Sequence, residues 1–460
     1  MKKVINERFL TILIVLSMIA LPILEFIGLP YRRRFFCQQE TLVIIGILLC
    51  IVLLLYYFIN IFKQNKSKKL VLSDIFIILS IIFSIISIIF SKDIKKSLTG
   101  EFTYCETPLQ VLAYFTLFFT CTLISKQENR KTIYEIFIFL AIVESIIAFL
   151  QNFSLWPLPS LFDPHWHVND HLAFGLTEHC NFFAAISIIF TAICATTFIY
   201  SNKYKKTICF LSLSVITCFS TLFTYTRIAW VGLFSIVFGL LVLIISTYIF
   251  KNDKLIFKKH FSKLFILIIC FIICFLTLQI LYGTILKEIE ISKSEISTSV
   301  NNSTNSQNVN LEKFGSSRGL IWKVGFSALQ KYPIVGVGFD NYRYCFEIYH
   351  KDLGWSQNKG HNEYIHTLVT QGIPSGINYL AFAFYCCFFP LIKILKGNSE
   401  FAKSHLTKIF LITLFAYFVQ ALFNSSVTNV APYKWILMGL LLPRTEQKNL
   451  FKTELFKRRK

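Results

Sequence analysis

The sequence predicts an all-α polytopic membrane protein, and three observations lead to that fold class. Apolar residues make up 55% of the 460 residues and charged residues only 15%, whereas about a quarter of a typical soluble domain is charged. The charged residues gather in short clusters between apolar runs, which approach the roughly 20 residues that a helix needs to cross the hydrocarbon core. The runs do not alternate apolar with polar residues, as membrane β-strands do. Because lipid offers no hydrogen bonds to the backbone, we expect the runs to be helices.

We expect about twelve transmembrane helices, an even number that places both termini in the cytoplasm. The spans are predicted at residues 9–30, 41–62, 71–91, 109–125, 133–152, 181–200, 207–224, 228–250, 264–284, 379–395, 409–424 and 430–443. The lysine-rich connectors 63–69, 203–206 and 251–263 then face the cytoplasm, as the positive-inside rule requires. The same rule accounts for much of the net charge of +21 and argues against a nucleic-acid partner. Only Arg32, Arg33 and Arg34 depart from it, because they fall outside.

The predicted spans divide the chain into four parts. Nine helices form a membrane domain at 1–284, an extracytoplasmic loop covers 285–378, three more helices follow at 379–443, and 444–460 is a basic cytoplasmic tail. No cytoplasmic connector is long enough for a nucleotide-binding domain, and the sequence has no GxxxxGK[ST] phosphate loop. These features argue against ATP-driven transport by this chain and against the use of cytosolic sugar nucleotides.

The large loop is expected to contain two short helices after a Ser/Asn-rich stretch at 292–310, to which we assign no role. The first helix should start at Ser316, with Ser as its cap, and end by Tyr332, because a proline follows. Its apolar face would comprise Leu320, Ile321, Val324, Ala328 and Leu329. The second should run from about residue 362 to 371 and stop at Gly372. Helices with one apolar face suggest packing against the mouth of the membrane domain.

Two arginines at the outer side are candidates for binding an anion. Arg227 joins two spans without any turn residue, so it lies at the membrane edge. It could simply reach toward the lipid headgroups, or it could clamp phosphate with its planar fork of donors. Arg318 falls at the start of the first loop helix, where the helix N-terminus already attracts anions. The alternative for Arg318 is an ordinary solvated loop residue.

Several other polar residues have two readings each. His361 is a possible general base, or a polar loop residue. Glu144 lies within a span, where a carboxylate is a functional candidate by default, or it pairs with a neighbouring helix. The loop at 153–180 contains His165, His167, His171 and His179. No cysteine or carboxylate completes a credible zinc site there, so we expect no metal and no cofactor.

Taken together, the motifs resemble the O-antigen ligase and O-antigen polymerase superfamily, over about residues 100 to 440. The motifs are Thr-x-x-Arg-x-x-Trp at 224–230, Ser-Arg-Gly-x-x-Trp at 317–322, Tyr-Pro-x-x-Gly-x-Gly at 332–338, His-Asn-x-Tyr at 361–364 and Gly-x-x-x-Gly at 372–376, preceded by 144–151 and 175–181. Each motif is short, and their order and placement carry the resemblance. Cys180 departs from the family pattern, in which proline would precede Asn181.

The resemblance implies a twelve-helix glycosyltransferase of the cytoplasmic (inner) membrane with an extracytoplasmic active site. Its donor would be a glycan on undecaprenyl pyrophosphate, and its acceptor a hydroxyl of a glycan, lipid or surface polymer. Arg227 and Arg318 would bind the pyrophosphate, and His361 would take the proton of the acceptor. Further substrate-binding residues would be Glu178, Asn181, Trp322, Asn362 and Tyr364. Because the lipid pyrophosphate is already a good leaving group, no metal is needed, and a single displacement would invert the anomeric carbon.

Three alternatives remain open at this stage. Within the family, a polymerase that joins the repeat units of a capsule or exopolysaccharide shares its motifs with a ligase that moves a finished glycan. A secondary transporter or flippase of the lipid-linked glycan is a second alternative, although internal repeats and polar residues at mid-membrane, typical of transporters, are not apparent. A third is a glycosyltransferase with its carboxylate in the first outer loop, where residues 31–40 offer only Glu40.

Overall fold

The structure is a computed structural model of the chain, and all regular structure in its described residues is helical. The described residues are 6–26, 34–63, 70–100, 106–156, 171–177, 179–283, 290, 317–349, 356–448 and 450. Several residues singled out above lie outside this set. They are Glu178, His165, His167, Arg32, Arg33, the stretch 292–310 and the end of the basic tail, residues 451–460.

Each of the predicted spans overlaps one helix. The helices that correspond to them are α1 (Glu7–Phe26), α2 (Arg34–Lys63), α3 (Leu72–Ile89), α5 (Pro108–Thr122), α6 (Gln127–Asn152), α8 (Cys180–Tyr200), α9 (Tyr204–Leu222), α10 (Arg227–Lys251), α11 (Lys254–Tyr282), α15 (Glu363–Lys396), α17 (His405–Gln420) and α18 (Ala431–Leu441). Nine helices of the described residues are long and apolar enough to cross a membrane, so the expected count of twelve is not confirmed. The shorter α5 is also apolar.

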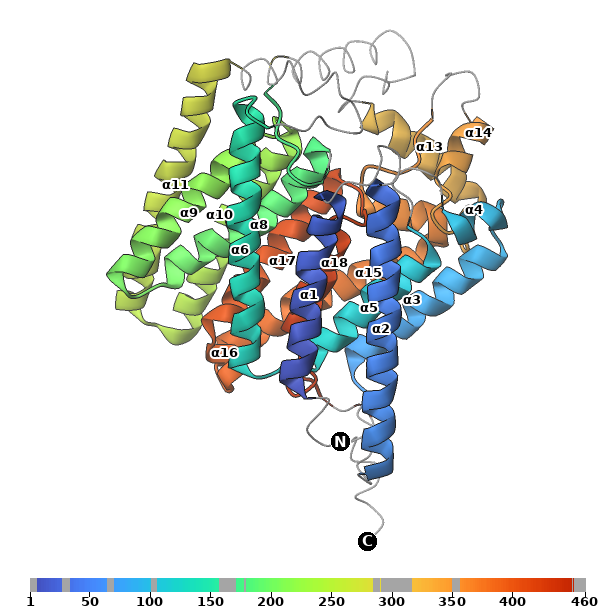
Figure 1. The fold of residues 1–460 in the computed structure, drawn as a ribbon, viewed down its shortest axis with the longest axis horizontal. Helices are drawn as coiled ribbons and strands as arrows, with labels where there is room; N and C mark the ends of the chain where they lie inside the picture. Colours follow the sequence, from blue (N-terminus) through green and yellow to red (C-terminus); the bar gives the residue numbers. More distant parts are fainter. Residues whose placement is uncertain are drawn as a thin grey trace.

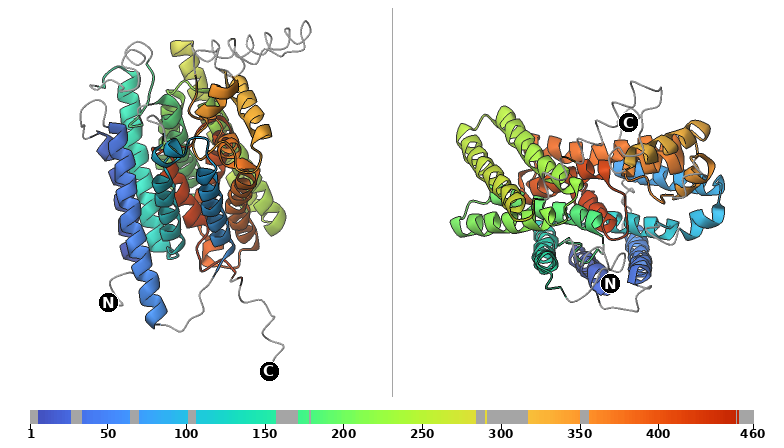
Figure 2. Two further views of the ribbon diagram at one scale, coloured as in Figure 1. Left: turned by 90° about the vertical axis from the view of Figure 1, so that its right-hand side faces the viewer. Right: turned by 90° about the horizontal axis from the view of Figure 1, so that it is seen from above.

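Helix α8 is the centre of the bundle. All but one of its residues are buried, as is typical of a helix that is apolar on every side. It packs against α6, α9, α10 and α17, while α18 packs against α5, and α5 against α2. Figure 2 shows α6, α1 and α2 standing in a row along one side of the molecule. In Figure 1, α9, α10 and α11 lie to one side of the centre and α3 to the other.

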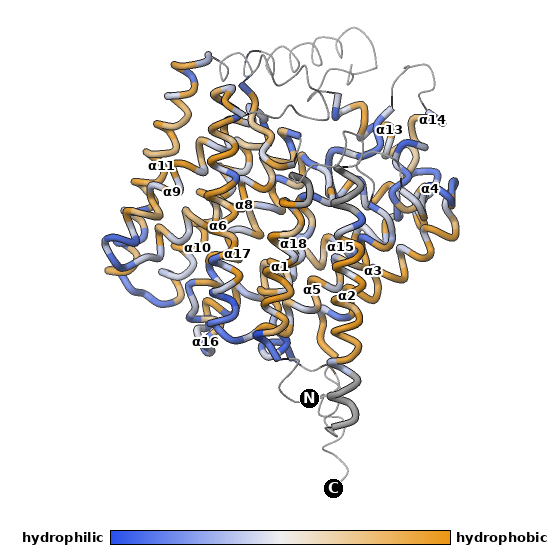
Figure 3. Tube along the Cα trace, viewed as in Figure 1, coloured by the Kyte–Doolittle hydropathy of each residue, from blue (hydrophilic) through white to orange (hydrophobic). Residues whose placement is uncertain are grey.

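The two ends of the bundle differ in what they contain. At one end, the amide of Arg444 donates to Thr122 O at 2.9 Å, and Ser125 Oγ donates to Glu7 at 2.8 Å. At the opposite end lie α13 (Arg318–Lys331), α14 (Arg343–Tyr349), α4 (Ile94–Thr99) and the N-termini of α5, α8, α10 and α15. We call this second end the motif end. Hydrophilic residues are concentrated at both ends, with apolar helices between them (Figure 3).

Helix α15 joins the predicted loop helix at 362–371 to the predicted span at 379–395. The expected loop boundary at residue 378 therefore falls inside this helix. The helical conformation is interrupted at Gly372, whose φ of 83° and ψ of 170° are not helical. Two residues later, Pro374 cannot donate a backbone hydrogen bond. The predicted end of a helix at Gly372 is thus an interruption within α15, which continues directly after it.

The Gly-x-Gly turn explains how the break is tolerated. The amides of Val337 and Gly338 donate to the oxygens of Val369 and Thr370 at 3.0 Å each, and Ile373 N donates to Pro333 O at 2.8 Å. A Cβ on Gly336 would lie 2.4 Å from the carbonyl carbon of Thr370. The motif therefore serves close backbone packing against α15, which bonds the carbonyls that the break leaves without helical partners.

Helix α13 has the apolar face that the sequence predicts, but it begins differently. Its N-cap is Ser317, in the left-handed conformation and without a side-chain cap bond, whereas the predicted cap, Ser316, lies outside the described residues. The buried side chains form a small core with α14 and α15; they are Leu320, Ile321, Val324, Ala328, Val337, Tyr342, Cys345, Phe346 and Val369, with Leu329 partly buried beside them. Through Val369 this core fixes the loop segment to the membrane domain.

The contact between α8 and α10 can be tested by a compensating pair of substitutions. A Cβ on Gly232 would lie 2.1 Å from Ile188 Cδ1, so Gly232→Ala should overpack the interface and destabilise the protein by about 1–3 kcal/mol. Thermal unfolding in detergent measures the effect. In an Ile188→Ala background the clashing atoms are gone, and Gly232→Ala should cost little. An equal cost in both backgrounds would contradict this packing.

Candidate functional site

His361 lies in a tight turn directly before α15. Its φ of 47° is in the left-handed region, which is unfavourable for a residue with a Cβ and persists only where neighbouring contacts impose it. Its Nε2 lies 3.3 Å from Gln357 Oε1. Because an amide oxygen can only accept, Nε2 carries the proton, and Nδ1 carries the lone pair. The neutral ring is therefore ready to accept a proton through Nδ1.

Arg318 and His179 are the charged and titratable neighbours that act most on His361. Burial, followed by the Arg318 guanidinium, His179 and His366, lowers the pKa of His361 to about 4. Such an effect needs proximity, because charges separated by water or distance interact weakly. The structure thus brings together three segments: the start of α13, the start of α8 and the turn before α15. In the sequence, His179 belongs both to the histidine-rich loop and to the motif at 175–181.

Arg227 is the half-buried first residue of α10. The segment before it is bonded to the turn at 171–177 that leads toward His179. Phe223 O accepts from the amide of Ala173 at 2.9 Å, and the hydroxyl of Tyr225 accepts from Asn152 at 3.2 Å. These bonds place Arg227 at the motif end, beside the segment that carries His179.

Polar side chains of α6 hold the 171–177 turn in place. Gln151 Oε1 accepts from the amides of Phe174 and Gly175 at 2.9 and 2.8 Å, and Glu144 Oε2 accepts from the amide of Leu176 at 3.1 Å. Glu144 is therefore bonded to the backbone of a loop, whereas we had weighed a site role against pairing with a neighbouring helix. Together these bonds account for the upstream motifs at 144–151 and 175–181.

The aromatic and amide residues of the motifs use their polar atoms inside the protein. Trp322 Nε1 donates to Gly360 O at 2.9 Å, and the hydroxyl of Tyr364 donates to Phe418 O at 2.8 Å. Asn362 caps α15, because its Oδ1 accepts from the amides of Tyr364 and Ile365 at 3.0 Å each. Its Nδ2 donates to the oxygen of Leu422 at 2.8 Å. These contacts fix both sides of His361, and substrate binding by the same residues stays a prediction.

Asn181 and His179 form part of the entry into α8. The amide of Asn181 donates to His179 Nδ1 at 3.1 Å, and its carbonyl accepts from Asn424 at 2.9 Å. His171 Nδ1 lies 2.8 Å from Asn152 O. Both described histidines of the predicted loop thus bond to backbone atoms. Within the described part of the chain, no three His, Cys, Asp or Glu residues are grouped so that they could hold a metal.

The sequence analysis missed a buried charged cluster next to this turn. Asp340 Oδ1 accepts from Lys359 Nζ at 2.5 Å and from His366 Nε2 at 3.0 Å. Lys359 also lies 3.4 Å from Glu106. The cluster depends on contacts between segments that are distant in the sequence, so no local pattern indicates it.

A second missed pair lies on the other side of the same region. Glu363 is paired with Lys434 and accepts from the hydroxyls of Tyr379 at 2.7 Å and Tyr417 at 3.0 Å. A lysine inside a predicted span is costly and usually functional or paired, so Lys434 could have been flagged from the sequence. The two clusters border a small cavity of about 90 Å³, whose walls include Glu106, Asp340 and Trp435.

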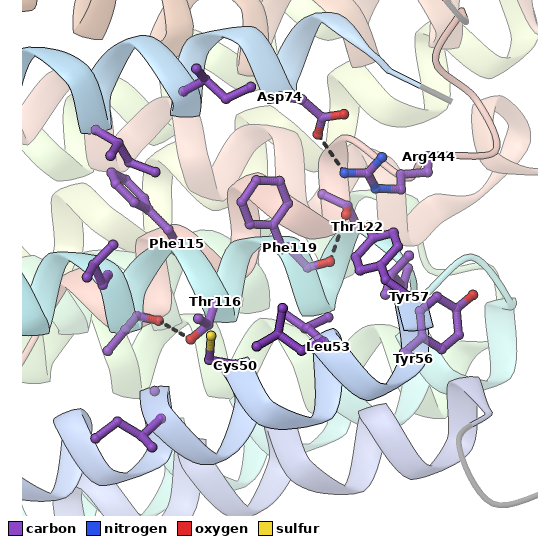
Figure 4. A pocket seen from close by; sticks show the side chains of 18 of the residues that line it. Cys50, Leu53, Tyr56, Tyr57, Asp74, Phe115, Thr116, Phe119, Thr122 and Arg444 are labelled. Atoms are coloured by element: carbon purple, nitrogen blue, oxygen red, sulfur yellow. Dashed lines mark hydrogen bonds and ion pairs between the residues drawn. The ribbon is translucent and has the colours of Figure 1, made fainter. Parts of the chain in front are cut away.

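A much larger cavity lies away from these residues, between α2, α3 and α5. It measures about 940 Å³ and is lined mainly by apolar side chains such as Leu53 and Phe115 (Figure 4). Near one end, Arg444 Nη2 is paired with Asp74 Oδ1 at 2.6 Å. An apolar wall suits hydrocarbon rather than a sugar or a phosphate, so size alone does not identify the chemical site.

One family of proteins matches the part of the chain that carries these motifs. Residues 212–380 match the family model described as O-antigen ligase, and this match confirms the resemblance to the O-antigen ligase and polymerase superfamily. The matched segment contains Arg227, Arg318 and His361, whereas Asn181 lies before it. No curated protein matches the chain in sequence. The family and the apolar helices together indicate an O-antigen ligase-like integral membrane protein.

The cap of α15 supplies a test of the turn. Asn362→Ala removes the acceptor of two amides and the donor to Leu422, so the free energy of unfolding should fall by about 1–2 kcal/mol. Asn362→Asp keeps the acceptor and should lose less. Thermal unfolding in detergent measures both variants, and equal losses would contradict the capping geometry.

Proposed function

We propose that this O-antigen ligase-like chain is an inverting membrane glycosyltransferase. Its donor is a glycan on undecaprenyl pyrophosphate, and its acceptor is a hydroxyl of a glycan, lipid or surface polymer. The chain lies in the cytoplasmic membrane with both termini inside, and the motif end faces outward. The observation that carries the proposal is the proximity of the half-buried His361 to Arg318, whose guanidinium helps to lower the pKa of the ring, within the segment that matches the family.

His361 acts as the general base. The hydroxyl oxygen of the acceptor attacks the anomeric carbon, and its proton passes to Nδ1 of His361. The bond between the anomeric carbon and the pyrophosphate oxygen breaks at the same time, and the bonding electrons leave with the pyrophosphate. A single displacement of this kind inverts the anomeric carbon. A positioned general base contributes typically about 10²–10⁴-fold to the rate.

Arg318 and Arg227 stabilise the departing pyrophosphate. The negative charge on the leaving group grows as the bond breaks, and a planar guanidinium offers paired donors to phosphate oxygens. Arg318 opens α13, so the N-terminal amides of that helix add to the attraction. Preorganised donors in a partly buried site are worth more than the same groups in water. No step in this scheme requires ATP or a metal.

A complementation experiment tests the three residues. The host gene is deleted and replaced by wild type, Arg227→Ala, Arg318→Ala or His361→Ala at matched membrane levels. His361→Ala should lower transfer by about 10²–10⁴-fold, and the arginine variants should also lose long glycan. The length distribution of surface and lipid-linked glycan is measured. Single repeat units on lipid indicate a polymerase, and full-length chains left on the carrier indicate a ligase.

Arg343→Ala is the matched control, because this arginine lies on α14 at the same end and is well exposed. It should support a normal glycan pattern. If Arg227→Ala, Arg318→Ala and His361→Ala also restore the normal pattern, the glycosyltransferase proposal is wrong. A transporter of the lipid-linked glycan then becomes the better reading.

The pH dependence of transfer tests the charge state of His361. Its lowered pKa of about 4 keeps the ring neutral through the physiological range. Protonation of His361 should therefore cause no fall of kcat/KM (no acid limb of the pH profile) near pH 6.5. Arg318→Gln removes a positive neighbour, so the pKa should rise and the acid limb should move to higher pH. A bound pyrophosphate is negative and also raises the pKa of His361. In the wild type, kcat should therefore begin to fall at a higher pH than kcat/KM as the solution is made more acidic. A limb unmoved by Arg318→Gln would contradict the proximity of the two groups.

A further inference from the structure

The carboxylate of Asp340 is a junction between three distant segments of the chain. Its Oδ1 accepts from Lys359 and His366, and its Oδ2 accepts from the amide of Glu106 at 2.8 Å. The side chains of Asp340 and Lys359 are only 5% and 6% exposed. Burial acts to raise the pKa of Asp340, but Lys359 and His366 outweigh it, so the pKa lies below its ordinary value. The carboxylate is therefore ionised.

The hydrogen bonds of His366 define its tautomer. An ionised carboxylate can only accept, so Nε2 of His366 carries a proton and donates to Asp340 at 3.0 Å. The amide of Gly360 donates to Nδ1 of His366 at 3.4 Å, so Nδ1 carries the lone pair. His366 thus links the Asp340 carboxylate to the backbone one residue before His361. Its ring also stacks on Tyr342.

Every residue beside His361 is held by one of these bonds or by a helix cap. Lys359 is paired with Asp340, Gly360 is bonded by both His366 and Trp322, and Asn362 is bonded to the start of α15 and to Leu422. Trp322 belongs to the same helix as Arg318, so the turn and the arginine share one support. This accounts for the left-handed backbone of His361, which would otherwise relax.

Stability alone does not explain the buried charges of Asp340 and Lys359. Removing charges from water costs several kcal/mol per ion, and apolar residues of similar volume often stabilise a core as well or better. The same chain has a comparable pair at its opposite end, Arg444 and Asp74 at 2.6 Å. That pair is remote from the turn and serves as an internal reference for structural loss alone.

We propose that Asp340, Lys359 and His366 are positioning residues, which hold His361 where it can take the acceptor proton. This inference rests on the proposed function of His361. Asp340 orients His366 and His366 holds the amide of Gly360. Lys359, the residue before Gly360, is held by its ion pair with Asp340. None of the three is assigned to contact the donor or the acceptor.

A double-mutant cycle tests the proposal. His366→Phe keeps an aromatic ring beside Tyr342 but removes both hydrogen bonds. With His361 present, this change should lower kcat by about 10–100-fold, as expected for a misplaced catalytic group, and the KM for the donor should change little. In a His361→Ala background it should cause no further loss. The pair Asp340→Asn with Lys359→Met should behave in the same way. In that variant Glu106 loses Lys359 but keeps the hydrogen bonds from Tyr114 and Ser426.

Hydrogen exchange supplies a readout that does not need activity. His366→Phe should speed exchange in the segment 356–362 and leave exchange elsewhere unchanged. Asp74→Asn is the control, because it breaks a buried ion pair away from the turn and should leave kcat per folded molecule at the wild-type value. A wild-type kcat in His366→Phe, or an equal loss with and without His361, overturns the positioning role. A wild type without transfer activity would instead refute the proposed function, while the exchange result still reports on the turn.

Discussion

The break of α15 at Gly372 is the constraint on which the motif end depends. A helix that stops within a membrane domain leaves carbonyls without partners, and each such group costs several kcal/mol in an apolar setting. Here the amides of Val337 and Gly338 bond the oxygens of Val369 and Thr370. The turn that supplies them can reach only if Gly336 lacks a side chain. Satisfying the backbone of one helix therefore docks the whole loop segment, including α13, onto the membrane domain.

That docking sets the positions of the candidate chemical groups. Asp340 follows the Gly-x-Gly turn by two residues and pairs with Lys359, two residues before His361. Trp322 of α13 bonds the backbone of Gly360, one residue before His361. Arg318 opens the same helix. The short family motifs thus have two physical roles. Some supply a charged or basic side chain, such as Arg318 or His361, and others, such as the Gly-x-Gly turn, hold the backbone that positions these side chains.

The charged groups buried at this end also hold the turn on both sides. The ion pair of Glu363 with Lys434, supported by two tyrosine hydroxyls, ties the start of α15 to α18. The Asp340 cluster ties the preceding turn to the segment before α5. Both lie in surroundings where an unpaired charge would cost several kcal/mol. Removing one partner from either set of interactions on the two sides of His361 should therefore destabilise the protein.

The sequence by itself determined the membrane class, the approximate positions of the helices, the apolar face of α13 and the stop at Gly372. These are local properties, since hydropathy, periodicity and the lack of a proline amide act within a few residues. Short motifs also identified Arg227, Arg318 and His361 as candidates. Only the tertiary structure decided that Trp322, Asn362 and Tyr364 form hydrogen bonds within the protein. It also decided that His179 lies near His361, and that Asp340, Lys359 and His366 contact one another. In the same cluster Lys359 and Glu106 are 253 positions apart, and no local pattern encodes which distant side chains a folded backbone brings within hydrogen-bonding distance.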